Sequence, residues 1–107
     1  MQEANVIRSL SALAHEARLR VFRALVVAGP EGLIPSALAE QLGIAPNALS
    51  FHLKELANAQ LINQERQGRN VVYRAQFSVM NDLLVYLTEN CCQGASCTTA
   101  SSTSCNC

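Results

Sequence analysis

Cysteine is absent from residues 1–90, although the chain of 107 residues contains five cysteines. No long uninterrupted apolar run is present, which excludes a membrane-spanning helix of about 20 apolar residues. The N-terminus, MQEANVIRSL, lacks a basic segment followed by an apolar stretch, so no secretory signal is expected. These absences predict a cytoplasmic protein with no membrane partner, whose thiols stay reduced rather than forming a disulfide framework.

An excess of positive charge is also lacking, because 8 basic and 8 acidic residues give a formal net charge of zero. This balance argues against a strongly basic nucleic-acid binder. The distribution is more informative, since residues 75–107 contain Asp82 and Glu89 and no basic residue. Residues 47–74 contain the cationic side chains Lys54, Arg66, Arg69 and Arg74. The sequence therefore predicts positive charge in a central segment, where a contact with DNA would need it.

The motifs that would indicate an enzyme are missing. The sequence shows no nucleophile with a histidine and a carboxylate, no phosphate-binding loop and no cofactor motif. A chain of this length forms one domain at most, with a core of marginal stability. A homodimer that buries a further apolar interface is therefore expected.

The pattern that is present begins with helical periodicity. Apolar residues recur at helical spacing over residues 6–29, which predicts two helices or one broken helix. The next helix is predicted to begin at Pro35, which suits a first turn, and to be capped by Gly43. Pro46 again fits a helix start, and a third periodic segment runs over residues 46–61. Two short helices joined by a tight turn are the pattern of a helix-turn-helix.

The periodicity changes after the third helix. Two extended runs, 62–66 and 71–76, flank the turn former Gly68, which predicts a β-hairpin in the position of a wing. Ser78 is the expected cap of a last helix over residues 78–90.

The third predicted helix has two faces of opposite character. At about 100° per residue, its leucines fall on one side and are predicted to lie in the core. The other side carries an amide, a hydroxyl, an aromatic ring and an ammonium group. Amides and hydroxyls read base edges, an apolar ring contacts a thymine methyl group, and a lysine pairs with a phosphate. A solvated face is the alternative, but the preceding helix, the tight turn and the basic hairpin favour DNA. The predicted core residues are Leu49, Leu53 and Leu56, and the predicted DNA-binding residues are Asn47, Ser50, Phe51 and Lys54.

Two further residues are candidates for contacts with DNA. His52 lies at the edge of the apolar side, as a structural histidine or a phosphate contact rather than a metal ligand, because no second histidine is expected nearby. Arg69 at the hairpin tip is placed for a phosphate or the minor groove, with a solubilising loop charge as the alternative. His15 is expected at a helix start or on the surface.

These elements predict a mainly α fold with a β-hairpin, in the form of a homodimeric winged helix-turn-helix. Residues 1–90 are the expected DNA-binding and dimerisation domain. Residues 91–107 are low in complexity and rich in small residues, so they are expected to form a flexible cysteine-containing tail. Apolar residues on the first and last helices are expected to need a partner surface: Val6, Leu10, Leu13, Leu83, Tyr86 and Leu87.

Three segments together resemble the ArsR/SmtB family of bacterial metal- and metalloid-responsive repressors: SALAHEARLRVFRAL, LAEQLGIAPNALSFHLKELANAQLI and ERQGRNVVYRAQF. The resemblance covers residues 6–90. It implies a homodimer whose first and last helices form the interface. It also implies binding to a palindromic double-stranded operator, release of that operator when an inducer binds, and control of genes for arsenic efflux or detoxification.

The resemblance also exposes a departure. Arsenic sensors of this family most often carry a cysteine pair on the helix before the recognition helix, where this chain has Leu33, Ile34 and Pro35. A zinc site on the last helix is not expected either, because that helix has Asp82 and Glu89 but no histidine. Among the sites that the resemblance suggests, only the C-terminal cysteines are left for an inducer.

The stretch NCCQGASC supplies the predicted inducer ligands Cys91, Cys92 and Cys97. A site made of thiolates alone selects soft ions, and trivalent arsenic takes three sulfurs in a pyramid. Gly94 lets the chain turn back, while a disulfide between adjacent cysteines is disfavoured by ring strain. The predicted inducer is therefore As(III), or Sb(III) with the same preferences, and no catalytic cofactor is expected.

Other interpretations of these thiols stay open. A zinc or copper(I) site would draw on Cys105 and Cys107, which are otherwise accessory ligands. A redox switch would use the same thiols, although separated partners rather than an adjacent pair are expected for it. A tail of thiols without function is disfavoured by the absence of cysteine from residues 1–90.

Overall fold

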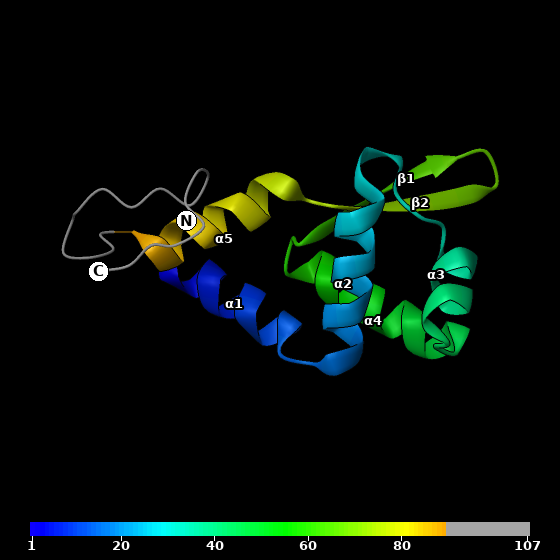
Figure 1. The fold of residues 1–107 in the computed structure, drawn as a ribbon, viewed down its shortest axis with the longest axis horizontal. Helices are drawn as coiled ribbons and strands as arrows, with labels where there is room; N and C mark the ends of the chain where they lie inside the picture. Colours follow the sequence, from blue (N-terminus) through cyan, green and yellow to red (C-terminus); the bar gives the residue numbers. More distant parts are fainter. Residues whose placement is uncertain (90–107) are drawn as a thin grey trace.

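The computed structural model describes residues 1–89 and contains five α-helices, a short 3-10 helix and one two-stranded antiparallel sheet (Figure 1). The predicted fold class, mainly α with a β-hairpin in a winged helix-turn-helix, is confirmed. The molecule is elongated, with α1 and α5 side by side at one end and α3 and the hairpin towards the other. The elements are α1 (Glu3–Leu13), α2 (Glu16–Ala28), η1 (Gly29–Glu31), α3 (Pro35–Leu42), α4 (Pro46–Asn58), β1 (Ile62–Gln67), β2 (Asn70–Ala75) and α5 (Phe77–Thr88).

His15 separates the first two helices. Its extended backbone ends the helical path, and its imidazole Nδ1 accepts a hydrogen bond from the Ala17 N–H at 3.2 Å. This bond satisfies one of the backbone donors that a helix start leaves unpaired. The periodic stretch therefore forms two helices, and the expectation that His15 lies at a helix start is confirmed.

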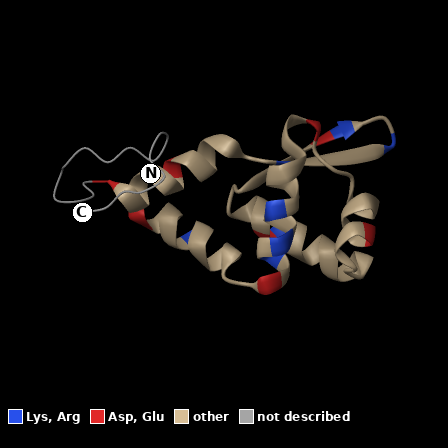
Figure 2. Cartoon of the chain, viewed as in Figure 1, with Lys and Arg blue, Asp and Glu red and all other residues tan. Residues whose placement is uncertain are grey.

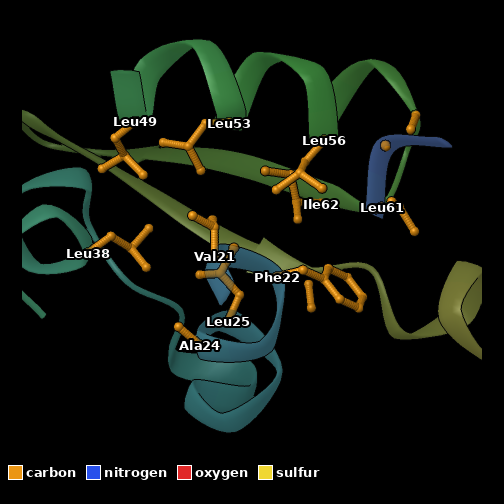
Figure 3. Packing of buried hydrophobic residues seen from close by; sticks show 13 residues of the cluster. Val21, Phe22, Ala24, Leu25, Leu38, Leu49, Leu53, Leu56, Leu61 and Ile62 are labelled. Atoms are coloured by element: carbon orange, nitrogen blue, oxygen red, sulfur yellow. The ribbon is translucent and has the colours of Figure 1, made fainter. Parts of the chain in front are cut away.

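The core forms where α2 and α4 pack face to face (Figure 3). Leu49, Leu53 and Leu56 of α4 are at most 2% exposed, as their spacing predicts, and they point towards Val21 and Leu25 of α2. Burial of each such leucine stabilises the fold by about 2 kcal/mol. The core thereby fixes which face of α4 remains outside.

Gly43 makes the turn between α3 and α4 possible. Its φ of 65° and ψ of 35° lie in the left-handed region that glycine enters without a steric penalty. The next residue, Ile44, donates its N–H to the Ala39 carbonyl at 3.1 Å and so closes the helix end. Pro35 and Pro46 each stand in a first helical turn. The predicted helix-turn-helix is thus present with its expected starts and turn.

Each strand of the hairpin extends one residue further towards the turn than predicted, and the second strand ends at Ala75 rather than at residue 76. Gln67 pairs with Asn70 across a tip formed by Gly68, with φ of 62°, and Arg69. A bridge that sequence patterns did not indicate adds Leu33 to this sheet. Leu33 and Tyr73 exchange two N–H···O hydrogen bonds of 2.9 Å, which tie the segment before α3 to the hairpin.

The last helix begins at Phe77, so the expected cap at Ser78 is wrong. Gln76 is the N-cap residue, with no capping bond from its side chain. The Gln76 N–H donates to the Leu61 carbonyl at 2.8 Å, which fixes the chain in an extended conformation there. The helix starts directly after this anchor, and Ser78 falls inside its first turn.

The end of the molecule formed by α1 and α5 has an exposed apolar face, but it includes only part of the predicted set. Val6 is 4% and Leu83 6% exposed, so both already lie inside the protomer. The apolar side chains that stay exposed are Ile7, Leu10, Leu84, Val85 and Leu87, with exposures from 42% to 58%. We call these residues the α1–α5 face.

None of the helices in residues 1–89 is long and apolar enough to cross a membrane.

Candidate nucleic-acid interface

The outer face of α4 is exposed as predicted. The exposed side chains on the side opposite the core leucines are Asn47, Ser50, Phe51 and Lys54. Phe51 is 52% exposed although it is a large apolar residue. Such a ring on a polar helix face is typical of a contact surface. The four side chains lie within two turns of one helix, which matches the reach of a recognition helix into a major groove.

Asn47 has part of its hydrogen-bonding capacity engaged. Its side-chain oxygen accepts from the Ala48 N–H at 3.0 Å, at the start of α4. The Asn47 amide group retains its two N–H donors, which suit the acceptor atoms at the major-groove edges of purines. Asn47 therefore keeps two donors available on the exposed face of α4, and its contact with DNA stays a prediction.

His52 lies under this face rather than on it. It is only 8% exposed, and its ring contacts the His15 ring at a centroid separation of 4.8 Å and an interplanar angle of 50°. The expectation that no second histidine lies nearby is therefore wrong, because the packing of α2 against α4 brings His15 to it. Its Nδ1 atom has no hydrogen-bond partner within residues 1–89. Burial, followed by the nearby charges of His15 and Arg18, lowers the pKa of His52 below the ordinary value of 6.5. This position favours the structural role that the sequence left open over a direct phosphate contact.

The two arginines Arg69 and Arg74 of the hairpin differ in whether they are bonded within the protein. Arg69 stands exposed at the hairpin tip, as predicted. Arg74 instead donates from Nε to the Pro30 carbonyl at 2.7 Å and pairs through Nη1 with Glu65 at 3.0 Å. A hydrogen bond from Gln67, together with the bond and charge of Arg74, lowers the pKa of Glu65. Arg74 therefore anchors the hairpin to η1, and its charge is not free for DNA.

The expectation that positive charge gathers in the central segment is wrong. Figure 2 shows basic residues on α2 as well as on the hairpin. Four of the eight cationic residues precede α3: Arg8, Arg18, Arg20 and Arg23. Arg18 is the one that reaches the recognition helix, because its guanidinium carbon lies 5.4 Å from the centroid of the Phe51 ring. The sequence did not indicate this contact, because it depends on the packing of α2 against α4.

The predicted metalloid ligands Cys91, Cys92 and Cys97, and the accessory Cys105 and Cys107, lie outside the described residues. Within residues 1–89 no group of three or more histidine, cysteine or carboxylate side chains is arranged to hold a metal ion.

The fold and the exposed face of α4 define a winged helix-turn-helix protein of the DNA-binding class. The family model described as "Helix-turn-helix domain" matches residues 13–65. No curated protein matches the sequence significantly.

Three solved structures relate the chain to known proteins. The ArsR-like transcriptional regulator from Rhodococcus sp. RHA1 is 27% identical, with a TM-score of 0.71 over 78% of this chain and 76% of that one. The AntR antimony-specific transcriptional repressor is 33% identical, with a TM-score of 0.63 over 78% and 75%. A homodimeric winged helix-turn-helix domain from Mycobacterium bovis, at 24% identity and a TM-score of 0.66 over 79% and 77%, shares the fold.

The chain belongs to the ArsR family of winged helix-turn-helix transcriptional regulators. Its named relatives are regulators, which supports the expectation of a regulator rather than an enzyme.

Proposed function

We propose that the protein is an arsenite-responsive transcriptional repressor. It binds a palindromic operator as a homodimer and dissociates when trivalent arsenic or antimony is bound by thiolates near the C-terminus. The observation that carries the DNA-binding part is the exposed set Asn47, Ser50, Phe51 and Lys54 on the second helix of a helix-turn-helix. The observation that carries the inducer part is the confinement of all five cysteines to residues 91–107.

The homodimer is proposed from the α1–α5 face. Five large apolar side chains exposed on two adjacent helices form more apolar surface than isolated exposed residues explain. The Mycobacterium bovis domain with the same fold is a homodimer. A two-fold axis at this end carries the two copies of α4 towards successive major grooves, about 34 Å apart.

The inducer site is proposed at the sequence that follows α5. The helix ends at Thr88, and the predicted ligands Cys91, Cys92 and Cys97 begin shortly after it. Thiolate ligands bind soft trivalent metalloids in preference to hard cations. The antimony specificity of AntR shows that a repressor with this fold has a group-15 metalloid as its effector. We assign residues 1–90 to DNA binding and dimerisation and residues 91–107 to inducer binding, in a reducing cytoplasm.

Coupling between the two parts goes through α5. Leu84, Val85 and Leu87 belong to both the last turns of α5 and the proposed dimer interface. Drawing three sulfurs around one arsenic atom constrains the chain directly beyond those turns and shifts the helix end. A coupling free energy of about 1–3 kcal/mol would weaken operator binding about 5- to 150-fold.

The test uses an operator that the full chain selects from random duplexes. Arsenite, antimonite, zinc, copper(I) and peroxide are titrated against the complex, and DNA release is followed by fluorescence anisotropy. Arsenite and antimonite are expected to release the DNA at the lowest concentrations. Release by zinc, copper(I) or peroxide in preference to both would replace the proposed inducer with that effector.

Ligand assignment follows from serine variants in the same assay. Cys91→Ser, Cys92→Ser and Cys97→Ser should each keep operator binding and lose most of the arsenite response, since two sulfurs impose less constraint on the helix end than three. The matched control is the Cys105→Ser/Cys107→Ser double variant, which should respond almost as the unmodified chain does. An equal loss of response in that control would contradict the three-ligand site.

A further inference from the structure

Phe51 is the most exposed apolar feature of the proposed reading surface, yet its ring has defined neighbours. The Arg18 guanidinium lies over its face, with the carbon 5.4 Å from the ring centroid. The His52 ring meets it at 5.8 Å with an interplanar angle of 60°, an edge-to-face arrangement. The ring is therefore placed between a cation from α2 and an imidazole from its own helix.

Arg18 is held by packing rather than by a carboxylate. Its Nε atom is buried without a hydrogen-bond partner within residues 1–89, and the ion pair found in that part of the chain joins Arg74 to Glu65. Glu55 lines the same pocket of about 400 Å³ between α1, α2 and α4, but it forms no ion pair with Arg18 in the described structure. The cation–π contact with Phe51 is thus the specific interaction of this guanidinium within residues 1–89.

The layer beneath the ring is fixed as well. His52 contacts the tilted ring of His15, and His15 is tied to the start of α2 because its Nδ1 accepts a hydrogen bond from the Ala17 N–H. The same turn of α2 carries Arg18. One short segment, residues 15–18, therefore contacts Phe51 directly through Arg18 and indirectly through His15 and His52.

The major groove offers one apolar group to such a ring. Base faces are covered by stacking in a duplex, and the exposed base edges carry polar donors and acceptors apart from the 5-methyl group of thymine. A phenyl ring on the outer face of α4 therefore finds its complement in a thymine methyl group. A ring that is already oriented loses less rotamer freedom on binding than a freely rotating one.

We propose that Arg18 is a specificity-determining positioning residue, which orients Phe51 to read the methyl group of one thymine in each operator half-site. This inference rests on the proposed DNA-binding function and deepens it. A lysine does not reproduce the role, because its ammonium group is more strongly hydrated than a guanidinium and is carried on a flexible four-carbon stem.

The experiment replaces each thymine of the selected operator by uracil, one position at a time, and measures dissociation constants at one salt concentration. Removal of a contacted methyl group should weaken binding by the full chain about 4-fold, the equivalent of burying one such group. Phe51→Ala should bind the thymine and uracil operators equally. Arg18→Lys, which keeps the charge, and Arg18→Ala should both reduce the thymine-to-uracil ratio below about 2-fold.

Arg20→Ala is the matched control, because Arg20 is an exposed arginine on the same helix without a ring contact in the described structure. It should lower affinity for both operators by the same factor and leave their ratio unchanged. Melting temperatures of all variants establish that they are folded. If Arg18→Ala is unstable, the thymine-to-uracil ratio of Arg18→Lys alone decides the outcome.

Two results would overturn the inference. One is an unmodified chain for which no thymine is sensitive to loss of its methyl group. The other is an unchanged ratio in a folded Arg18→Lys variant. A chain that selects no duplex at all contradicts the proposed DNA binding itself, so the two failures are told apart by the selection step.

Discussion

Gly32 is predicted to be a position where one added methyl group disrupts the attachment of the hairpin. Its φ is +68°, and a Cβ atom would lie 2.5 Å from the Tyr73 carbonyl oxygen and 2.6 Å from Val72 Cγ1. The oxygen belongs to the backbone and accepts the Leu33 N–H, so no side-chain rotation relieves the clash. Gly32→Ala must therefore shift the bridge that holds the hairpin against the segment before α3.

Gly29 provides a matched control for the magnitude. Its φ of +70° is almost the same, but a Cβ atom there would meet nothing within 4 Å. With ψ of −148°, Gly29 adopts a backbone conformation that is almost confined to glycine, so Gly29→Ala should cost only this backbone strain, about 1–3 kcal/mol. Gly32→Ala should add about 1–3 kcal/mol for overpacking. At about 4–8 °C per kcal/mol for a domain of this size, the two variants should differ in melting temperature by about 5–20 °C.

The assay is thermal unfolding followed by circular dichroism at one protein concentration, since dimerisation makes the melting temperature concentration-dependent. Gly32→Ala should also weaken operator binding more than Gly29→Ala, because the hairpin that carries Arg69 loses its anchor. Equal melting temperatures for the two variants would refute the reasoning that the close approach at Gly32 matters.

The remaining predictions concern the α1–α5 face, the DNA contacts and the pH response. Val85→Lys should leave the protein monomeric by light scattering at micromolar concentration, whereas Val27→Lys, at an equally apolar and 79% exposed position on α2, should leave it dimeric; a dimeric Val85→Lys variant would argue against the proposed interface. Ser50→Ala should weaken operator binding at its contacted base pair, and Arg69→Ala should weaken binding to all sequences alike and reduce the salt slope by about one unit; unchanged affinity in both would contradict the proposed DNA surface. The pKa of His52 is lowered in the folded protein, so the unfolded chain takes up a proton at a higher pH than the folded protein does. The free energy of unfolding is therefore highest above about pH 6.5 and falls as the pH decreases through the folded-state pKa. Urea unfolding between pH 7.5 and 5.5 should therefore show a steeper loss for the unmodified chain than for His52→Gln, and parallel losses would show that His52 does not contribute.

The recognition helix could be predicted from sequence because its determinants are local. Spacing alone places Leu49, Leu53 and Leu56 together, and the burial of these leucines leaves Asn47, Ser50, Phe51 and Lys54 outside. The turn at Gly43 follows equally directly from the conformational freedom of glycine at a positive φ.

The features that were not predicted depend on contacts between distant segments. The bridge between Leu33 and Tyr73 joins residues that no periodicity relates. The start of α5 is set by a hydrogen bond from the Gln76 N–H to the Leu61 carbonyl rather than by a capping side chain. The prediction that Ser78 caps the helix was therefore wrong. Val6 and Leu83 belong to apolar stripes, but the crossing of α1 and α5 buries them inside the protomer.

The side-chain cluster of the candidate interface shows the same limit. His15, Arg18 and His52 carry chemistry that is visible in the sequence, but only the packing of α2 against α4 brings them to Phe51. A charge count restricted to the central segment missed Arg18, because the cation that reaches the recognition helix comes from a helix that precedes it.

Arsenite release of operator DNA from the full chain and from a chain truncated after Asn90 tests the central claim most directly. Both proteins are bound to the same labelled operator, and arsenite is added while anisotropy is recorded. The account predicts that the full chain loses affinity about 5- to 150-fold and that the truncated chain stays bound at every arsenite concentration. Release of the truncated chain by arsenite, or retention of the full chain, would contradict it.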